Sequence, residues 1–262
     1  MDNQNNKNLD SLVEACNKYD IRLTTEMKDQ FIKYYDHLIE INEHMNLTAI
    51  TQWDDVVLKH FIDSISLLGY LNSKDNSGDE ISKLFQSKIN NKKEIKVLDL
   101  GTGAGFPGIP LKIVCPELNL TLADSLNKRV NFLKEIITLL DLTKTEAIHG
   151  RAEELSRKKE MREKYDLVVS RAVANASTLC EYCLPFVKPG GYFVSYKTES
   201  VDEEEAKAKN AIKILGGTTE KIYHFNLYNS DMARSFLIIK KINNTPKSYP
   251  RKAGQPSKDP IQ

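Results

Sequence analysis

Residues 97–108 decide the fold and read Val97-Leu98-Asp99-Leu100-Gly101-Thr102-Gly103-Ala104-Gly105-Phe106-Pro107-Gly108. The apolar beginning is typical of a buried strand, and the glycines permit positive φ angles and a close approach of backbone to a ligand. Pro107 suits the first turn of a following helix. The stretch therefore predicts a strand, a turn almost without side chains and a helix, an arrangement typical of a binding loop for a nucleotide-like ligand.

After this loop the sequence alternates between short apolar runs and helical patterns, which predicts an α/β fold with a largely parallel sheet. We expect strands at 96–100, 119–123, 145–149, 167–170, 191–196, 220–225 and 235–239, and helices at 107–114, 125–140, 152–157, 175–184 and 201–215. The last two strands lie close together in sequence and suit an antiparallel hairpin. The prediction is a Rossmann-like sheet of seven strands, mostly parallel, with a terminal hairpin.

Changes of pattern along the chain indicate four regions. The first shows helical periodicity with a cap at Thr24 or Thr25, and the second is polar, with room for one short helix. The last is basic, with six lysines and arginines from Lys240 onward against one acid, and four prolines that prevent a regular helix. We expect a helical subdomain at 1–71, a linker at 72–94, the α/β domain at 95–242 and a basic, extended arm at 243–262.

The composition is that of an ordinary globular protein. The 262 residues are 40% hydrophobic and 28% charged, with a net charge of +1, so a nucleic-acid partner would have to be held by a local basic surface. Neither a leader segment nor an apolar run of roughly 20 residues is present, and we expect a cytoplasmic protein without membrane contact. Four scattered cysteines, with one isolated pair at Cys180 and Cys183, predict neither a disulfide framework nor a metal site.

Three residues follow predicted strands at the edge where open α/β sheets bind ligands. Asp124 lies about 20 residues beyond the glycine turn and is expected to accept hydrogen bonds from ribose hydroxyls, the alternative being a cap for the next helix. Glu153 either faces the ligand or occupies a first helical turn that favours negative charge. Arg171 either attracts a carboxylate, a phosphate or a base edge, or forms a surface salt bridge.

Residues 103–108 also match the G-x-G-x-x-G pattern of dinucleotide-binding dehydrogenases. Asp99 opposes this reading, because a carboxylate just before the glycines would compete with a pyrophosphate; it could instead position the turn or a cationic ligand. The terminal hairpin and the lack of a catalytic domain after the sheet also fit a dehydrogenase poorly. An acidic strand end, a glycine turn and a second acid suit S-adenosylmethionine, which carries a sulfonium and a ribose but no phosphate. This pattern is that of a class I methyltransferase.

Motifs along nearly the whole chain support a closer assignment. The motifs lie at 46–50, 60–64, 99–110, 124–129, 150–153, 170–172, 184–191 and 249–254. Their most specific parts are Phe-Pro-Gly-Ile-Pro at 106–110 and Tyr-Pro-Arg-Lys at 249–252. In these motifs the chain resembles the bacterial 16S ribosomal RNA guanine-N7 methyltransferase family known as RsmG or GidB.

The resemblance implies an S-adenosylmethionine-dependent enzyme that methylates N7 of a guanosine in 16S ribosomal RNA, free or within the small ribosomal subunit. Together with the residue patterns, it assigns the methyl donor to Asp99, Gly101, Gly103, Phe106, Asp124, Ser125, Leu126, Ala152, Glu153 and Arg171. Arg171 is the candidate catalytic residue, and no general base is expected because guanine N7 carries a free lone pair. Candidates for the RNA side are His60, Asp63, Arg129, Lys197, Arg251 and Lys252. We expect a monomer; the alternatives are a small-molecule methyltransferase and a non-catalytic RNA-binding or ribosome-assembly factor on the same fold.

Overall fold

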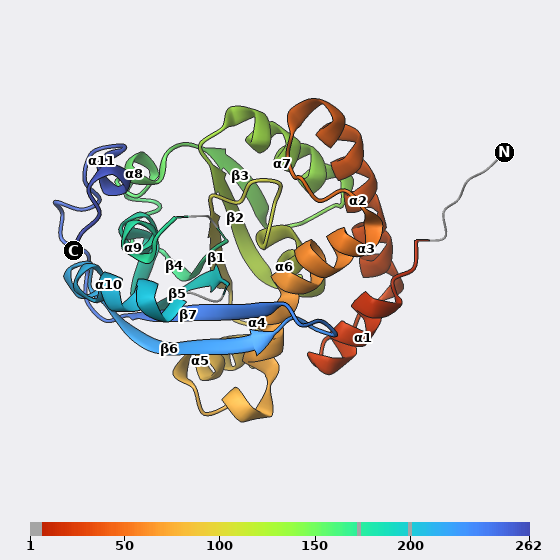
Figure 1. The fold of residues 1–262 in the computed structure, drawn as a ribbon, viewed down its shortest axis with the longest axis horizontal. Coiled ribbons are helices and arrows are strands. Elements are labelled where there is room, and N and C mark those ends of the chain that lie inside the picture. The colour runs from red at the N-terminus through yellow and green to blue at the C-terminus, as the bar shows by residue number, and fades with distance from the viewer. Residues whose placement is uncertain (1–6, 172–173, 199–200) are drawn as a thin grey trace.

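The computed structural model describes residues 7–171, 174–198 and 201–262, and its centre is a seven-stranded sheet with the order β3-β2-β1-β4-β5-β7-β6 (Figure 1). Strands β1 to β5 run parallel, and β7 is antiparallel to both β5 and β6. The predicted class I fold with its terminal hairpin is therefore confirmed. The strands are β1 (Ile95–Leu100), β2 (Leu118–Asp124), β3 (Thr145–His149), β4 (Tyr165–Ser170), β5 (Val187–Lys197), β6 (Gly217–Asn226) and β7 (Ala233–Lys241).

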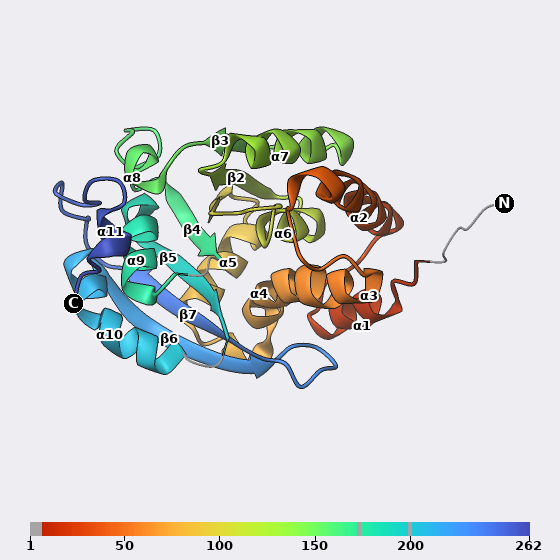
Figure 2. The same ribbon diagram turned by 45° about the horizontal axis from the view of Figure 1, so that its top comes forward.

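Helices cover both faces of this sheet, with α1 to α4 on the side of α6 and α7 and with α8 to α11 on the other side (Figure 2). Successive side chains of a strand point to opposite faces, so Val97 joins the core beneath the N-terminal helices and Leu98 the core beneath α9 and α10. Within the described residues no helix is both long and apolar enough to cross a membrane. The helices are α1 (Asp10–Lys18), α2 (Thr25–Met45), α3 (Trp53–Val56), the π-helix η1 (Val57–Ile62), α4 (Asp63–Asn72), η2 (Lys74–Asn76), α5 (Glu80–Asn90), α6 (Gly108–Val114), α7 (Asn127–Leu139), α8 (Ala152–Leu155), α9 (Ala176–Cys183), η3 (Leu184–Phe186), α10 (Val201–Ile214) and α11 (Gln255–Lys258).

The N-terminal region is helical and packs on the sheet domain. Thr24 caps α2, because its hydroxyl oxygen accepts a hydrogen bond from the N–H of Met27 at 3.2 Å. The polar stretch at 72–94, expected to be a linker with one short helix, contains the eleven-residue α5. Ile81 and Phe85 of α5 are buried against neighbouring elements. This stretch therefore belongs to the packed body of the protein.

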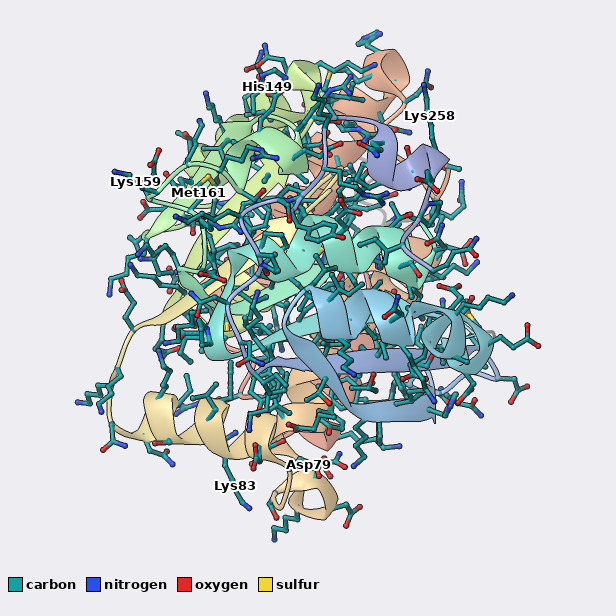
Figure 3. The ribbon with its side chains drawn as sticks, turned by 90° about the vertical axis from the view of Figure 1, so that its left-hand side faces the viewer. Asp79, Lys83, His149, Lys159, Met161 and Lys258 are labelled. Atoms are coloured by element: carbon teal, nitrogen blue, oxygen red, sulfur yellow. The ribbon has the colours of Figure 1, made fainter. Side chains whose placement is uncertain are left out.

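The C-terminal segment at 243–262, called the tail below, does not extend away from the protein. The Arg162 guanidinium donates to the carbonyls of Thr245 at 2.9 Å and Tyr249 at 3.1 Å, and the Thr178 hydroxyl donates to the carbonyl of Pro256 at 3.0 Å. Prolines lack an N–H but keep their carbonyl, so a proline-containing segment still accepts such bonds. The tail is thus tied to the body, and Lys258 of α11 remains exposed on its outer surface (Figure 3).

We predict that Gly108→Ala destabilises the protein, because an added Cβ would lie 2.5 Å from Cδ2 of Leu122 and 2.8 Å from Oδ2 of Asp99. Overpacking of this kind costs about 1–3 kcal/mol. Urea denaturation measures the effect, and Gly78→Ala is the matched control because nothing lies within 4 Å of its added Cβ. Equal unfolding free energies for the two variants would contradict the packing around Gly108.

Candidate active site

A cavity of about 420 Å³, called the first cavity below, opens at the carboxyl edge of the sheet. Strand order reverses between β1 and β4, the place where open α/β sheets bind ligands. The volume of the first cavity lies within the range of about 300–1,000 Å³ that is usual for small-molecule sites. Of the residues predicted to bind the cofactor, those that line it are Gly101, Asp124, Ser125, Ala152 and Glu153.

Asp99 lies beneath the glycine loop and is fully buried. Its Oδ2 accepts hydrogen bonds from the Thr102 hydroxyl at 2.6 Å and from the Gly108 N–H at 2.8 Å. Burial raises the pKa of Asp99 to about 6, although these two hydrogen bonds act in the opposite direction. Asp99 connects the two ends of the glycine loop from below, and it is absent from the described residues that line the first cavity. The geometry supports its expected role in positioning the turn.

Asp124 holds the other side of the loop. Its carboxylate accepts the Gly103 N–H at 3.0 Å on Oδ2 and the Leu126 N–H at 2.9 Å on Oδ1, and Nη1 of Arg129 lies 3.5 Å from Oδ2. The bond from Leu126 holds the turn before α7. It is not the helix cap considered as the alternative for Asp124, because Leu126 is the N-cap of α7 and no side chain caps this helix. Because each oxygen of an ionised carboxylate can accept more than one hydrogen bond, Oδ1 retains a further acceptor site on the cavity wall. Asp124 can therefore hold the glycine loop and the turn before α7 and still accept a hydrogen bond from a ligand.

Glu153 joins the first cavity to the tail. Its side chain lines the cavity, and Oε1 accepts the Gly254 N–H at 2.9 Å. Gly254 and Ser257 of the tail line the same cavity. The tail therefore forms part of the wall of the site.

Arg251, expected on the RNA side, turns into the body. Its backbone N–H donates to Oε1 of Glu181 at 2.7 Å, and its Nη2 donates to Oε2 of the same carboxylate at 2.7 Å. Glu181 is fully buried, and Nη1 of Arg251 also lies 3.3 Å from Oδ2 of Asp259. This cluster fixes the tail just before Gly254.

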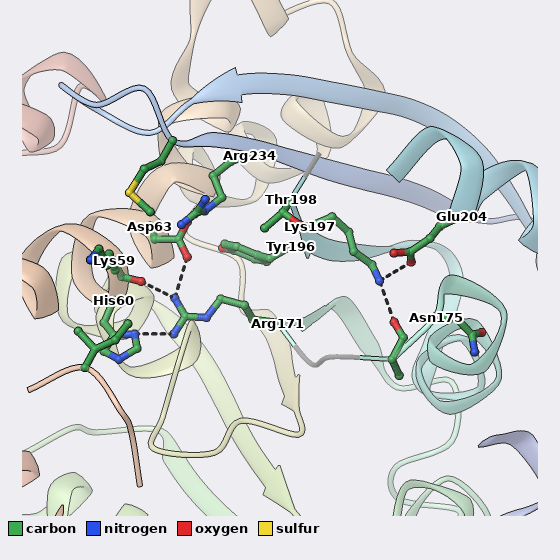
Figure 4. A pocket seen from close by; sticks show the side chains of 13 residues that line it. Lys59, His60, Asp63, Arg171, Asn175, Tyr196, Lys197, Thr198, Glu204 and Arg234 are labelled. Atoms are coloured by element: carbon green, nitrogen blue, oxygen red, sulfur yellow. Dashed lines mark hydrogen bonds and ion pairs between the residues drawn. The ribbon is translucent and has the colours of Figure 1, made fainter. Parts of the chain in front are cut away.

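A second cavity, of about 690 Å³, lies next to the first, and Ala174 lines both. Arg171, expected at the methyl donor, enters this second cavity from the segment after β4 and is not among the described residues that line the first (Figure 4). Nη1 of Arg171 donates to Oδ2 of Asp63 at 2.8 Å and to the carbonyl of Lys59 at 3.2 Å. Asp63 also accepts, on Oδ1, a hydrogen bond from Nε of Arg234 at 2.8 Å. Thus α4, the end of β4 and β7 meet at one carboxylate.

His60 and Phe106 form the wall behind Arg171. Their rings stack with centroids 4.3 Å apart, and the Arg171 guanidinium lies 5.2 Å from the Phe106 centroid. Phe106, expected at the methyl donor, is 5% exposed and lies outside the described linings of both cavities.

Burial and the Arg171 charge lower the pKa of His60 to about 3, so the ring is neutral at pH 7. Nδ1 of His60 lies 3.1 Å from Nη2 of Arg171; because a guanidinium only donates, the ring proton is on Nε2, 2.8 Å from the Thr48 hydroxyl.

The other expected RNA-side residues differ in their surroundings. Nζ of Lys197 lines the second cavity and lies 2.6 Å from Oε2 of Glu204. Arg129 pairs with Asp124, as described above, whereas Lys252 is exposed on the tail.

Sequence reasoning missed Arg234 and Gly254 as site residues. Arg234 lies near the start of the terminal hairpin, and no local pattern links it to Asp63, which is 171 positions away. Gly254 closes the tail motif at 249–254, so the motif marked the segment but not its contact with Glu153.

The strand order, the terminal hairpin, the glycine loop above a buried acid and the acid at the end of β2 define the class. The protein is a class I, S-adenosylmethionine-dependent methyltransferase. A family model described as GidB, rRNA small subunit methyltransferase G, matches residues 27–231. The chain belongs to this family.

Individual relatives agree over almost the full length. The chain is 48% identical over 251 residues to ribosomal RNA small subunit methyltransferase G of Lachnoclostridium phytofermentans, with 96% of each chain covered. It is 47% identical over 253 residues to the protein of the same name from Alkaliphilus oremlandii, with 97% of this chain and 98% of that one covered.

We predict that Asp99→Asn changes the pH dependence of stability. The pKa of Asp99 is raised in the folded state from its ordinary 3.8 to about 6, so the folded protein binds this proton more tightly than the unfolded chain. The resulting stabilisation is complete below pH 4 and is lost as the pH rises through 6, at up to about 1.4 kcal/mol per pH unit. Asparagine does not titrate. Urea denaturation between pH 4.5 and 7.5 should show the wild type losing stability relative to Asp99→Asn; a constant difference would contradict the raised pKa.

We predict that Arg251→Gln weakens binding of S-adenosylmethionine about tenfold, or about 1.4 kcal/mol. The buried Glu181 loses its partner, the tail shifts, and Gly254 withdraws from Glu153. Calorimetric titration measures the affinity, and thermal unfolding shows that the variant remains folded. Lys252→Gln is the control, since Lys252 is exposed on the same tail. Equal affinities for both variants would contradict a role of Arg251 in shaping the first cavity.

Proposed function

We propose that this methyltransferase transfers the methyl group of S-adenosylmethionine to N7 of a guanosine in 16S ribosomal RNA. The observation that carries the proposal is the family match over residues 27–231, together with near full-length relatives named for the small-subunit RNA. The two adjoining cavities suit a cofactor and a second reactant. We further propose that the protein acts as a cytoplasmic monomer on this RNA, free or in the small subunit.

The first cavity fits S-adenosylmethionine in the chemistry of its walls. The carboxylates of Asp124 and Glu153 are acceptors for ribose hydroxyls and favour a cationic ligand. Gly101 and Gly103 have φ angles of +71° and +63°, and a Cβ on Gly103 would find nothing within 4 Å, so the loop leaves open space. Ser125, Leu126 and Ala152 would lie along the adenosine. Asp99 would act from beneath the loop.

The reaction requires little acid–base catalysis by the protein. When bound, S-adenosylmethionine supplies an electrophilic methyl group on its sulfonium. Guanine N7 offers a free lone pair and loses no proton before it attacks. Correspondingly, His60 is neutral and is held between Arg171 and Thr48, and Asp99 is enclosed beneath the loop. We assign to this chain the alignment of the two reactants, which contributes about 7–11 kcal/mol in favourable cases. Arg171 lies on the wall of the second cavity, which adjoins the first at Ala174.

We predict that Glu153→Gln weakens binding of S-adenosylmethionine about tenfold. The variant keeps an oxygen for the Gly254 N–H but loses the negative charge, and charge-assisted hydrogen bonds are about twice as strong as neutral ones. The matched control is Glu154→Gln, an exposed acid on the same short helix. Calorimetric titration distinguishes them, and an unchanged affinity for Glu153→Gln would remove this carboxylate from the cofactor site.

The proposed activity is tested with labelled S-adenosylmethionine and small-subunit ribosomal RNA from cells that lack the modification. The expected result is label in the RNA, located by chemical cleavage at N7-methylguanosine. Intact small subunits, tested in parallel, distinguish the two forms of substrate. Cofactor binding without transfer to either form would indicate a non-catalytic RNA-binding factor, and transfer only to small molecules would indicate the other alternative.

A further inference from the structure

The second cavity has a cationic wall. Four of its lining side chains are basic, namely Lys59, Arg171, Lys197 and Arg234, and two are acidic, namely Asp63 and Glu204. The first cavity already accounts for a cofactor. We propose that the second cavity contains a phosphate-binding site for the RNA backbone, formed by Arg171 and Arg234 and positioned by Asp63. This inference rests on the proposed RNA substrate.

The Asp63 carboxylate holds both guanidinium groups, one on each of its oxygens. Asp63 is 4% exposed. Its Oδ2 accepts a hydrogen bond from Nη1 of Arg171, and its Oδ1 accepts one from Nε of Arg234, each at 2.8 Å. In the part of the chain that the structure describes, Nε of Arg171 and Nη2 of Arg234 have no hydrogen-bond partner. The pair therefore keeps N–H donors available, in a geometry set by a buried group.

The excess positive charge of the cavity is concentrated on this pair. Lys59 lies 2.7 Å from the Asp55 carboxylate, and Lys197 lies 2.6 Å from that of Glu204. The ring of His60 is neutral. Two guanidinium groups then share one carboxylate, which leaves about one unit of positive charge and matches one phosphodiester.

A phosphate suits this pair better than the target base does. Methylation at N7 leaves a positive charge on the guanine ring, and cationic donors against the base would oppose that charge. A phosphodiester keeps its negative charge throughout the reaction, and the guanidinium fork is well matched to its oxygens. Because Ala174 lines both cavities, a backbone phosphate held here would keep its nucleotide beside the first cavity.

The test measures the affinity of unmethylated small-subunit ribosomal RNA between 50 and 200 mM salt for wild type, Arg234→Gln and Arg234→Lys. Loss of one phosphate contact should reduce the slope of log affinity against log salt by about 0.7. We expect this reduction in Arg234→Gln, its recovery in Arg234→Lys, and an unchanged affinity for S-adenosylmethionine in both. Lys209→Gln on α10, whose side chain is 70% exposed and lies outside the cavity, is the control for charge loss and should keep the wild-type slope.

An unchanged slope in Arg234→Gln would overturn the proposal, and a lower turnover with an unchanged slope would instead place the arginine against the base. If Arg234→Gln does not fold, wild-type protein is tested with RNA fragments that carry one neutral methylphosphonate at successive positions around the methylated guanosine. At least one position should weaken binding about tenfold, and no effect at any position would overturn the proposal. Failure of wild type to methylate RNA that it binds with the expected slope would refute the proposed function alone.

Discussion

The carboxylate of Asp63 is the point on which the arrangement of the site depends. It accepts hydrogen bonds from Arg171, which follows β4, and from Arg234, near the start of β7, while it belongs to α4 itself. Three parts of the chain that lie far apart in sequence are thereby joined at a buried charge. Removal of one partner from such a cluster typically costs about 3–5 kcal/mol, because the remaining charge stays buried. The N-terminal helices are therefore part of the site as well as of the core.

A few contacts also fix the walls of the first cavity. Asp99 and Asp124 hold the glycine loop from below and from the side, so the loop presents its backbone to a ligand. The tail forms part of the cavity wall through Gly254 and is fixed by Arg251 on the buried Glu181. The basic tail consequently forms part of the wall of the first cavity, and its lysines Lys252 and Lys258 are exposed. In the proposed function, the tail therefore serves both the cofactor and the RNA.

Local patterns predicted the fold well. The alternation of apolar strands and helical stretches is encoded in short windows, and the end of β2 was expected within one residue of Asp124. The rule that ligands bind at strand ends singled out Asp124 and Glu153, and both line one cavity in the structure. Their role in binding the cofactor stays a prediction. The partners of Arg171, Arg251 and Phe106 could not be predicted in this way. Each depends on a contact between segments distant in sequence, with Asp63, Glu181 and His60 respectively, and periodicity carries no information about such pairs.

The central claim is that the first cavity, with the tail as one wall, holds the cofactor and that the second does not. Amide hydrogen exchange with and without S-adenosylhomocysteine tests this claim directly, because a ligand slows exchange in the backbone that it covers. The account predicts slower exchange at Gly101 and Gly103, at 150–153 and at Gly254, with little change around Lys59 and Arg234. Protection confined to the second cavity, or a tail that exchanges equally fast in both states, would contradict it.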